Sequence, residues 1–335
     1  MTIKTIDLFS GIGGIRLGFE KACKKLNVEH SCVFASDIKK TACEVYRHRF
    51  GKLPDPFCDI TKVDEKTIPD FDILFGGFPC QAFSRAGNEL GFKDTRGTLF
   101  FDVKRIIEEK RPIAFLLENV GGLLRHDHGK TIKIILEVLE DLGYLVRYQI
   151  INSMNFGVPQ KRPRIYIVGF DKQFAGGTFE FPSSSGIKTR LSDILEPNPV
   201  DGEFYITQTY WEYLLKHKKQ NKENGNGFGY QIKSPSGLAS TLMSGGMGIE
   251  SNLIKDTGNH ELPSHANSAR IRTMTPIEWE RLQGFEDNWT DIASRTSRMD
   301  LLGNSVTVNV IEAISENIIK ELLNKKVPDG NSIFD

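Results

Sequence analysis

The chain has 335 residues, which corresponds to about two domains at roughly 150 residues per domain. Hydrophobic residues make up 39% of the chain and charged residues 26%, and this balance excludes a fully disordered protein. Because 43 Lys and Arg residues balance 43 Asp and Glu residues, the net charge is zero. Any contact with nucleic acid must therefore come from a local basic surface.

Two further exclusions concern the membrane and the cysteines. No apolar run approaches the roughly 20 residues that a membrane helix needs. The N-terminal MTIKTIDLFSG is typical of a strand and lacks the pattern of a signal peptide. The five cysteines form no CxxC pair and the histidines do not cluster, which argues against a disulfide framework and a zinc site. The sequence predicts a cytoplasmic, reduced protein with no membrane partner and no metal.

Strands and helices alternate through the first half of the chain. β-rich runs predict strands over 5–9, 33–35, 71–75, 114–117, 145–151 and 164–169. Apolar residues at helical spacing predict helices over 15–26, through 45–46, over 99–109 and over 131–142. This alternation predicts an α/β fold with a mostly parallel sheet and helices on both faces. Ligands then bind outside the carboxyl ends of the strands, where we expect the functional motifs.

The composition changes after about residue 181. PSSSG (182–186) is a plausible linker, and the stretch to about 271 is rich in Gly, Asn and Ser with poor helical periodicity. TPIEWERL (275–282) regains helical character behind an N-cap, and 306–323 is a long amphipathic helix that we expect to return to the first domain. We predict a first domain over 1–185, a small loop-rich second domain over 186–272, a hinge over 273–302 and a returning helix over 303–335.

A glycine-rich turn links the first predicted strand to the first helix. In DLFSGIGG (7–14) the glycines let a ligand approach the backbone, and the helix start favours polar or anionic groups. The dinucleotide fingerprint GxGxxG fails because Arg16 stands at its last glycine. Asp37 ends the second strand, where an acid can hydrogen-bond a ribose, and Asp59 follows a third such element. These features suggest an adenosine-containing cofactor; a tight turn with a surface aspartate is the alternative.

Cys80 lies in GGFPCQAFS (76–84), directly after the apolar run FDILF. This motif places the thiol in a loop at the carboxyl end of a central strand, behind a proline that stiffens the backbone. A thiol attacks as its thiolate, which needs an electropositive or helix-N-terminal setting. Cys23, Cys32 and Cys43 are predicted to be inert, small hydrophobic residues, and Cys58 is left unassigned.

Two polar motifs follow further along the chain. LLENV (116–120) places Glu118 after a buried run, where desolvation would favour its protonated form and allow proton donation at neutral pH. An acid exposed at the strand tip is the alternative. QKRPRIYIVG (160–169) brings three cations to the start of a strand. They either form a solvated charged face or hold a phosphate or a base carbonyl.

These motifs resemble those of the bacterial cytosine-5 DNA methyltransferases. DLFSGIGG, GGFPCQAFS, LLENV and QKRPRIYIVG, together with RLQGF (281–285) and GNSVTVNV (303–310), occur in the order and spacing of that family. The resemblance covers nearly the whole chain outside 185–270, and single-domain enzymes of restriction–modification systems are the most similar. It implies the S-adenosylmethionine-dependent methyltransferase fold. The catalytic and cofactor-binding domain would be 1–185, and the target-recognition domain 186–272.

The resemblance also implies the chemistry. Cytosine carbon 5 is a poor nucleophile, and a thiolate that adds at carbon 6 makes carbon 5 reactive toward a sulfonium methyl group. Cys80 is expected to supply that thiolate, and Glu118 to contact ring nitrogen 3 and the exocyclic amine. Arg164 is expected to hold the base carbonyl, with Arg162 nearby. A base then removes the hydrogen from carbon 5, Cys80 is expelled, and no metal takes part.

The implied cofactor is S-adenosyl-L-methionine. The residues expected to hold it are Phe9, Gly11, Ile12, Gly14, Asp37, Ile38, Asp59, Ile60, Pro79, Leu99, Asn304 and Ser305. Among them, Asp37 matches the ribose-binding acid, and Asp59 with Ile60 matches the adenine wall. Several relatives carry an aromatic residue at the position of Ile38, so the packing on adenine would be aliphatic here and the binding weaker.

The implied substrate is double-stranded DNA, with the target base flipped out because stacking hides carbon 6. The segment 81–98 has three glycines and the cations Arg85, Lys93 and Arg96, which suits a lid over DNA phosphates; an ordinary surface loop is the alternative. ASTLMSGGMG (239–248) resembles the element of the family that reaches the major groove. The residues expected to contact DNA are Gln81, Ser84, Arg85, Arg96 and Thr241.

Three other functions were weighed against this one. A tRNA cytosine-5 methyltransferase shares the Pro-Cys and Glu-Asn-Val motifs, but the length of 185–270 and its Thr-Leu and glycine element favour DNA. The absence of a complete GxGxxG motif and the presence of the Pro-Cys motif argue against a nucleotide-dependent dehydrogenase. The joint presence of Cys80, Glu118 and Arg164 argues against a non-catalytic DNA-binding scaffold. The resemblance further implies a monomer, and a cognate restriction endonuclease as a genetic rather than a bound partner.

Overall fold

The computed structural model describes residues 2–51, 55, 57–79, 99–174, 178–227, 229–244 and 248–324. The chain divides into two compact units. The first comprises Met1–Asn152, Pro163–Ser184 and Val306–Asp335, and the second comprises Ser153–Arg162 and Ser185–Ser305. The segment 273–302, for which a hinge is predicted, thus shares a unit with 186–272.

The first unit contains a six-stranded sheet with the order β2-β1-β3-β4-β6-β5. Its strands are β1 (Thr2–Leu8), β2 (Glu29–Ser36), β3 (Ile73–Gly76), β4 (Ala114–Val120), β5 (Tyr144–Asn152) and β6 (Pro163–Asp171). β2, β1, β3 and β4 pair in parallel, whereas β6 runs antiparallel to both of its neighbours. The predicted α/β class with a mostly parallel sheet is confirmed. Because β6 is reversed, its first residues lie at the edge where β4 ends.

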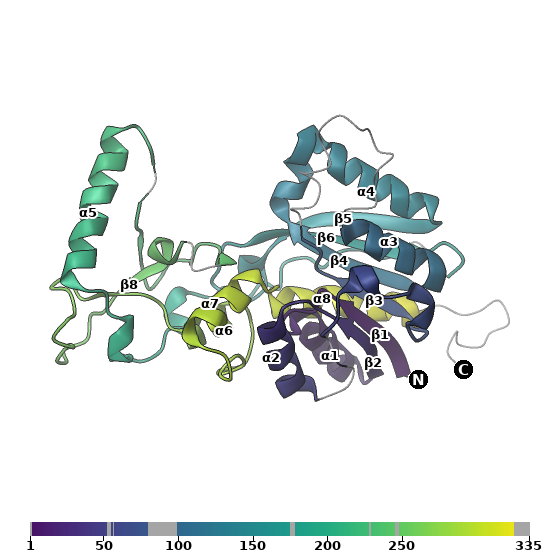
Figure 1. Ribbon diagram of the computed structural model, residues 1–335, viewed down its shortest axis with the longest axis horizontal. Helices are drawn as coiled ribbons and strands as arrows, with labels where there is room; N and C mark the ends of the chain where they lie inside the picture. The colour runs from purple at the N-terminus through teal and green to yellow at the C-terminus, as the bar shows by residue number, and fades with distance from the viewer. Residues whose placement is uncertain are drawn as a thin grey trace. The chain divides into compact units, whose positions relative to one another are not determined.

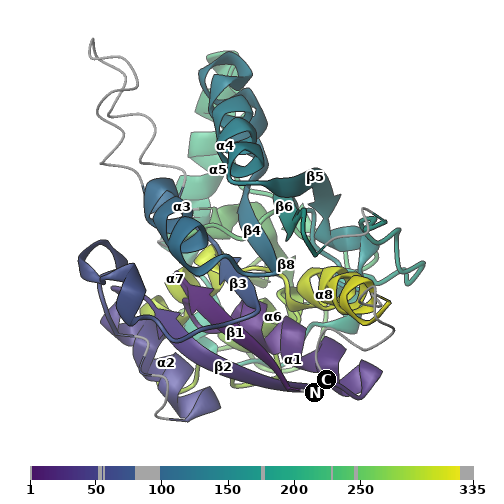
Figure 2. The same cartoon turned by 90° about the vertical axis from the view of Figure 1, so that its right-hand side faces the viewer.

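Helices cover both faces of this sheet (Figures 1 and 2). They are α1 (Gly14–Leu26), α2 (Lys40–Phe50), α3 (Leu99–Lys110), α4 (Lys130–Asp141) and α8 (Val308–Leu323). Figure 2 shows α3 on one face and α8 with α1 on the other. On the α1 face, the ring of Phe19 lies 4.9 Å from that of Phe75 in β3, centroid to centroid.

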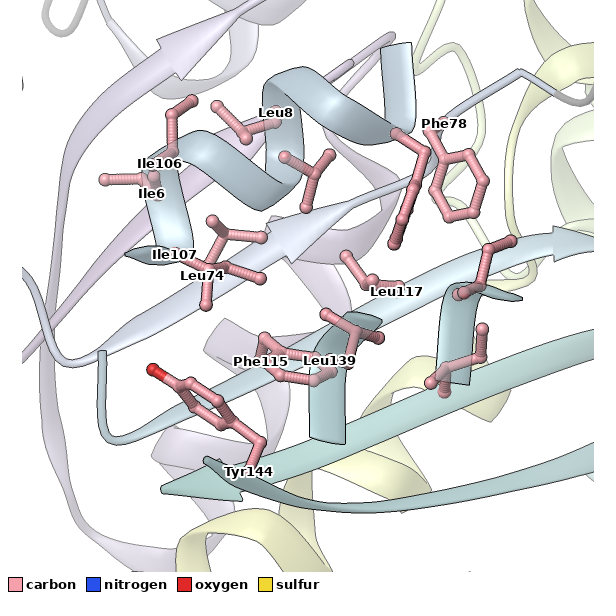
Figure 3. Close-up of a cluster of buried hydrophobic side chains, with 14 of the residues drawn as sticks. Ile6, Leu8, Leu74, Phe78, Ile106, Ile107, Phe115, Leu117, Leu139 and Tyr144 are labelled. Atoms are coloured by element: carbon pink, nitrogen blue, oxygen red, sulfur yellow. The ribbon is translucent and has the colours of Figure 1, made fainter. Parts of the chain in front are cut away.

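The main core fills the space between the sheet and the helices α3 and α4 (Figure 3). Alternate residues of β1 and β4 face it, among them Ile6, Leu8, Phe115 and Leu117, each of them fully buried. The strands read as nearly continuous apolar runs because helices cover the sheet on both sides. Polar residues such as Asp37 and Glu118 lie at or near the carboxyl ends of these strands.

The turn into α1 requires residues that tolerate left-handed backbone. Gly13 caps the start of α1 at φ 80°, and Asn27 ends the helix at φ 54°. Both positions suit residues without a β-branched side chain, and glycine is the least strained there. A Cβ on Gly13 would also lie 2.1 Å from the ring of Phe50. This glycine is therefore needed both for its backbone angle and for the packing of α2.

The second unit combines helices with a small sheet. Its helices are α5 (Gln208–Glu223), α6 (Pro276–Leu282) and α7 (Arg295–Asn304), and its strands are β7 (Ile232–Lys233), β8 (Leu253–Lys255) and β9 (Ile271–Arg272). The predicted helix α6 is confirmed, with a capping box between Thr275 and Glu278. The 16-residue helix α5 is not predicted by the periodicity. Only Trp211 and Leu214 of α5 are buried, so its apolar stripe is too narrow to stand out from the polar residues around it.

No helix within the described ranges is both long and apolar enough to span a membrane.

Candidate active site

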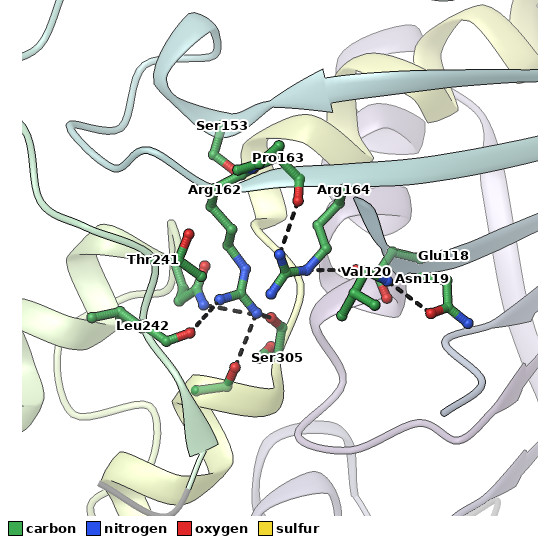
Figure 4. Close-up of polar contacts among 12 residues, drawn as sticks. Glu118, Asn119, Val120, Ser153, Arg162, Pro163, Arg164, Thr241, Leu242 and Ser305 are labelled. Carbon is green, nitrogen blue, oxygen red and sulfur yellow. Dashed lines mark hydrogen bonds and ion pairs between the residues drawn. The ribbon is translucent and has the colours of Figure 1, made fainter. Parts of the chain in front are cut away.

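Glu118 and Arg164 form an ion pair at the carboxyl edge of the sheet (Figure 4). Arg164 Nε lies 3.3 Å from Glu118 Oε1, and the two side chains are only 13% and 12% exposed. Glu118 lies near the end of β4, and Arg164 near the start of the antiparallel β6, where it is the register partner of Val120. The reversal of β6 therefore brings the predicted carboxylate and the predicted cation together.

Asn119 fixes the backbone that leads to Cys80. Its side-chain amide donates a 2.8 Å hydrogen bond to the carbonyl of Phe78, and Asn119 is buried. A Cβ on Gly77 would lie 3.6 Å from Glu118 Oε2, so the loop after β3 passes directly beside the carboxylate. Cys80 itself lies outside the described residues, as do Gln81, Ser84, Arg85 and Arg96. The sequence motif contains Asn119, but its spacing alone does not reveal this anchoring contact.

Arg162 has surroundings different from those of Arg164. It is 1% exposed, and its guanidinium donates to the carbonyls of Leu242, Gly303 and Ser305 (Figure 4). All of these residues belong to the second unit. The sequence places Arg162 among the catalytic residues, near the base carbonyl that Arg164 is expected to hold, whereas in the structure its terminal nitrogens donate to backbone carbonyls.

The predicted cofactor loop follows β1. Phe9 has a φ of 55° and Gly11 a φ of 52°, and a non-glycine residue such as Phe9 in left-handed backbone marks local strain of the kind found at ligand sites. A Cβ on Gly11 would meet nothing within 4 Å, so the backbone there faces open space. Ile12 and Gly14 continue the turn and are buried. Asp37 Oδ2 accepts a 2.8 Å hydrogen bond from the backbone N–H of Gly11 and thereby holds the turn.

Two exposed apolar side chains lie next to Asp37. Ile38 is 72% exposed, and Phe57, whose backbone forms a parallel bridge with that of Asp37, is 52% exposed. Sequence reasoning singled out Ile38 but missed Phe57, which no motif marks. Asp59 caps a short 3-10 turn by accepting from the N–H of Thr61, and Ile60 is buried in the main core. An exposed aromatic ring beside an acid at the end of parallel strands suits an adenosine.

The remaining predicted ligand contacts are distributed over both units. Pro79 is exposed at the end of the loop after β3, and Leu99 is the first residue of α3. Asn304 and Ser305 belong to the second unit, where the Asn304 side chain donates to the carbonyl of Asp300. Thr241 is also in the second unit, and its hydroxyl donates to the carbonyl of Lys161 at 2.6 Å.

The other described thiols are poor nucleophiles. Burial raises the pKa of Cys23 and of Cys43 to about 12, and that of Cys32 to about 11. Cys58 is half-buried, and its pKa is raised for the same reason. Cys23, Cys32 and Cys43 are buried, and this burial agrees with their predicted role as small hydrophobic residues. Within the part of the chain that the structure describes, no group of three or more His, Cys, Asp or Glu residues could hold a metal ion.

A family model described as C-5 cytosine-specific DNA methylase matches residues 3–320 of the chain. The Type II methyltransferase M.HpaII of Haemophilus parainfluenzae is 46% identical over 95% of this chain and 90% of its own length. M1.ScrFI of Lactococcus lactis subsp. cremoris is 45% identical over 96% of this chain and 79% of its own length. M.SsoII of Shigella sonnei is 46% identical over 95% of this chain and 80% of its own length. Both are also Type II methyltransferases.

Solved structures share the fold at low sequence identity. The methyltransferase EhMeth of Entamoeba histolytica superimposes with a TM-score of 0.74 at 21% identity and covers 97% of this chain and 100% of its own. A DNMT2 variant from Spodoptera frugiperda gives a TM-score of 0.72 at 20% identity, over 95% and 99% of the two chains. At such identities the likeness establishes the architecture alone.

Proposed function

Because the chain belongs to the C-5 cytosine-specific DNA methylase family and is a DNA (cytosine-5) methyltransferase that uses S-adenosylmethionine, we propose that it methylates one cytosine within a short, specific duplex sequence. The matching Type II methyltransferases place this activity in restriction–modification, and they favour DNA over the tRNA alternative. The observation that carries the assignment of residues is the Glu118–Arg164 pair beside Gly77, three residues before Cys80 in the sequence.

We assign the covalent step to Cys80. Its thiolate adds to carbon 6 of the flipped cytosine, and ring nitrogen 3 takes a proton from Glu118. Carbon 5 then carries the electron pair of an enamine. When bound, the cofactor supplies an electrophilic methyl group to that carbon. A base next removes the hydrogen from carbon 5, the bond to the Cys80 sulfur breaks, and nitrogen 3 returns its proton to Glu118.

The role of Arg164 follows from its contact with Glu118. A guanidinium has five N–H donors. Nε of Arg164 pairs with Glu118 and one terminal nitrogen donates to the carbonyl of Pro163 at 2.9 Å, so the other terminal nitrogen can serve a further acceptor. We assign that acceptor as the carbonyl of the base. The ion pair also fixes the carboxyl group in place before the base arrives, which is the preorganisation that electrostatic catalysis requires. Arg162 acts through the backbone that it holds.

The residues at the end of β1 and β2 fit an adenosine-containing cofactor. Asp37 already accepts from Gly11 and from the N–H of Lys39, and a carboxylate with about four acceptor positions can still bind ribose hydroxyls. Ile38 and Phe57 offer apolar surface for adenine, and the open backbone at Gly11 suits the polar end. The resemblance adds Phe9, Ile12, Gly14, Asp59, Ile60, Pro79, Leu99, Asn304 and Ser305 to the proposed contacts.

We assign DNA binding to two segments. Gln81, Ser84, Arg85 and Arg96 lie in the segment that follows Cys80, which we propose to be a lid over the flipped base. Thr241 belongs to the proposed recognition domain, 186–272. The resemblance further supports action as a monomer in the cytoplasm, alongside a cognate endonuclease that need not bind this chain.

The first experiment is a methylation map. Unmethylated plasmid is incubated with the protein and S-adenosylmethionine, and 5-methylcytosine is then read at base resolution. We expect methylation confined to one short repeated context. Glu118→Gln should lower the methylation rate by about 10²–10³-fold, since it removes the proton donor but keeps the side-chain shape. Cys80→Ala should abolish methylation.

The matched control is Glu137→Gln, because Glu137 is an exposed carboxylate of α4 that pairs only loosely with Lys133, at 3.7 Å. It should change the rate by less than about twofold, as surface ion pairs contribute little. Methyl transfer to total tRNA, with none to DNA, would overturn the DNA assignment. Transfer that survives Cys80→Ala would remove Cys80 from the mechanism.

A further inference from the structure

Three buried polar side chains meet inside the second unit. Gln160 and Gln283 are fully buried, and Arg162 is 1% exposed. Buried polar groups are stable only where they are hydrogen-bonded, so their partners indicate what they hold together. Several of the partners are backbone groups of two segments far apart in the sequence, and the carbonyls of Leu282 and Leu302 are further acceptors. We call Ala239–Ser244 the recognition segment and Gly303–Ser305 the GNS segment.

Arg162 joins the two segments directly. One terminal nitrogen donates to the carbonyl of Leu242 at 2.7 Å. The other donates to the carbonyls of Gly303 at 3.0 Å and Ser305 at 2.6 Å. The planar guanidinium fork fixes the directions of its donors, so these three carbonyls are held in one geometry.

Gly303 brings the same two segments into backbone contact. A Cβ at Gly303 would lie 2.4 Å from the carbonyl oxygen of Met243 and 2.7 Å from the backbone nitrogen of Ser244. Backbone atoms cannot move aside as the end of a flexible side chain can. The glycine is therefore required by the close approach of the recognition segment, which is an observation independent of the Arg162 contacts.

The two glutamines complete the junction. Gln160 Oε1 accepts from the N–H of Leu242 at 3.0 Å, and its amide donates to the carbonyl of Leu282. Gln283 donates to the carbonyl of Leu302 at 2.9 Å. Gln160 also donates to Gln283 Oε1 at 3.4 Å, and Gln283 donates to the carbonyl of Ser305 at 3.4 Å, so the two glutamines form a second chain of buried hydrogen bonds between the segments. Each such group left without a partner is destabilising, because it has given up its hydrogen bonds to water.

We propose that Arg162 and Gly303 couple the recognition segment to the GNS segment, so that a ligand which orders one of them also orders the other. Arg162 is on this view a positioning residue. The inference rests on the proposed function in one respect: Thr241 is assigned to DNA, and Asn304 with Ser305 to the cofactor. Binding of S-adenosylhomocysteine should then stiffen the recognition segment before any DNA is present.

The test is hydrogen–deuterium exchange with and without S-adenosylhomocysteine, a stable analogue of the cofactor. The reporter amides are those of Leu242, bonded to Gln160, and Ser305, bonded to the carbonyl of Leu302. Without ligand, Arg162→Lys should speed exchange at both reporters by about tenfold or more, because an ammonium cannot span three fixed carbonyls. Gly303→Ala should do the same from the opposite side of the junction.

The matched control is Arg281→Lys. Arg281 also donates to a backbone carbonyl of the second unit, that of Ile194, and pairs with Asp287, but it lies outside the junction. It should leave both reporters unchanged. Thermal unfolding of each variant establishes that it is folded.

With the analogue bound, the wild-type chain should show slower exchange at Leu242 as well as at Ser305. In Arg162→Lys the protection should stay confined to Ser305. Faster exchange at one reporter only, in both junction variants, would overturn the coupling. So would wild-type protection at Ser305 alone. A wild-type chain that does not bind the analogue would instead count against the proposed function, and the ligand-free comparison would still decide whether the junction couples the segments.

Discussion

Asp7 is a buried carboxyl group whose oxygens have no hydrogen-bond partner among the described residues. It lies two residues before the cofactor loop, on the face of β1 that carries Arg16 of α1. Burial raises the pKa of Asp7 to about 7, although the nearby charge of Arg16 lowers it in part. In the same region, burial lowers the pKa of His30 to about 4. The folded chain thus favours a neutral Asp7 and a neutral His30.

Asp7 and His30 make the free energy of unfolding depend on pH in opposite directions. Folding raises the pKa of Asp7 from 3.8 to about 7, so its stabilising contribution is complete below pH 4 and is lost as the pH rises toward 7. His30 acts in the opposite direction, because stability is lost there as the pH falls from 6.5 toward 4. We expect Asp7→Asn to remove the Asp7 contribution alone. Its free energy of unfolding should equal the wild-type value near pH 4 and exceed it by up to about 4 kcal/mol at pH 8.

Urea unfolding between pH 4 and 8 measures this difference. Asp70→Asn is the control, since the Asp70 side chain is 97% exposed and pairs with Lys110 at the surface. The free energy of unfolding of Asp70→Asn should change with pH in the same way as that of the wild type, from pH 4 to pH 8. A difference between Asp7→Asn and the wild type that stays constant with pH would contradict the assignment.

Phe57 is the residue-scale feature on which cofactor affinity should depend. It stands exposed beside Asp37, where Ile38 offers only an aliphatic surface. Removal of an aromatic stacking surface costs about 0.5–1.5 kcal/mol beyond the lost area. We expect Phe57→Ala to weaken S-adenosylhomocysteine binding about tenfold by calorimetry, with Phe57→Leu intermediate and the turnover number at saturating cofactor retained. Ile292→Ala, which truncates a comparably exposed residue, should have no effect. Unchanged affinity in Phe57→Ala would exclude the ring from the site.

At the scale of elements, the strand and helix pattern of the first unit is largely predictable from the sequence. Apolar runs ending at Asp37 or Glu118 mark strands whose polar ends form the site, since a parallel sheet gathers those ends at one edge. The direction of β6 is not predictable, because an apolar strand has the same hydrophobic pattern whether it pairs parallel or antiparallel to its neighbours. That direction decides whether Arg164 meets Glu118. α5 is missed for a different reason, as only two of its residues are buried.

The contact between α1 and α8 yields a prediction with an unusual sign. Gly18 lies in the interior of α1, where Gly→Ala ordinarily stabilises a helix by about 1 kcal/mol. Here the new Cβ would lie 2.6 Å from Cβ of Ile311 and 2.9 Å from the carbonyl oxygen of Val308. We therefore expect Gly18→Ala to lower the free energy of unfolding by about 1–3 kcal/mol. Urea unfolding checks it, with Gly227→Ala as the control, because a Cβ there meets nothing within 4 Å. A stabilised Gly18→Ala would show that the two helices do not press together at this point.

At the scale of the whole molecule, the motifs identify the family. The composition change near residue 181 lies close to the unit boundary at 184, but no such signal marks the boundaries at 152, 162 and 305. Ser153–Arg162 joins the second unit through contacts alone. Gln160 and Arg162 are buried there against partners such as Leu282 and Ser305, which lie 122 and 143 residues further along the chain. Spacing along the chain cannot reveal such partners. Zero net charge is equally uninformative about where DNA would bind.

This division of the chain has a consequence for exchanging specificity between relatives. A transplant of 185–305 alone, the long contiguous insert, would leave the ten residues of 153–162 behind. The donor's counterpart of Leu242 would then have to present its N–H and carbonyl to the host's Gln160 and Arg162 in the same backbone geometry. A chimaera that takes both 153–162 and 185–305 from the same donor keeps the buried contacts between these two segments as they are in the donor.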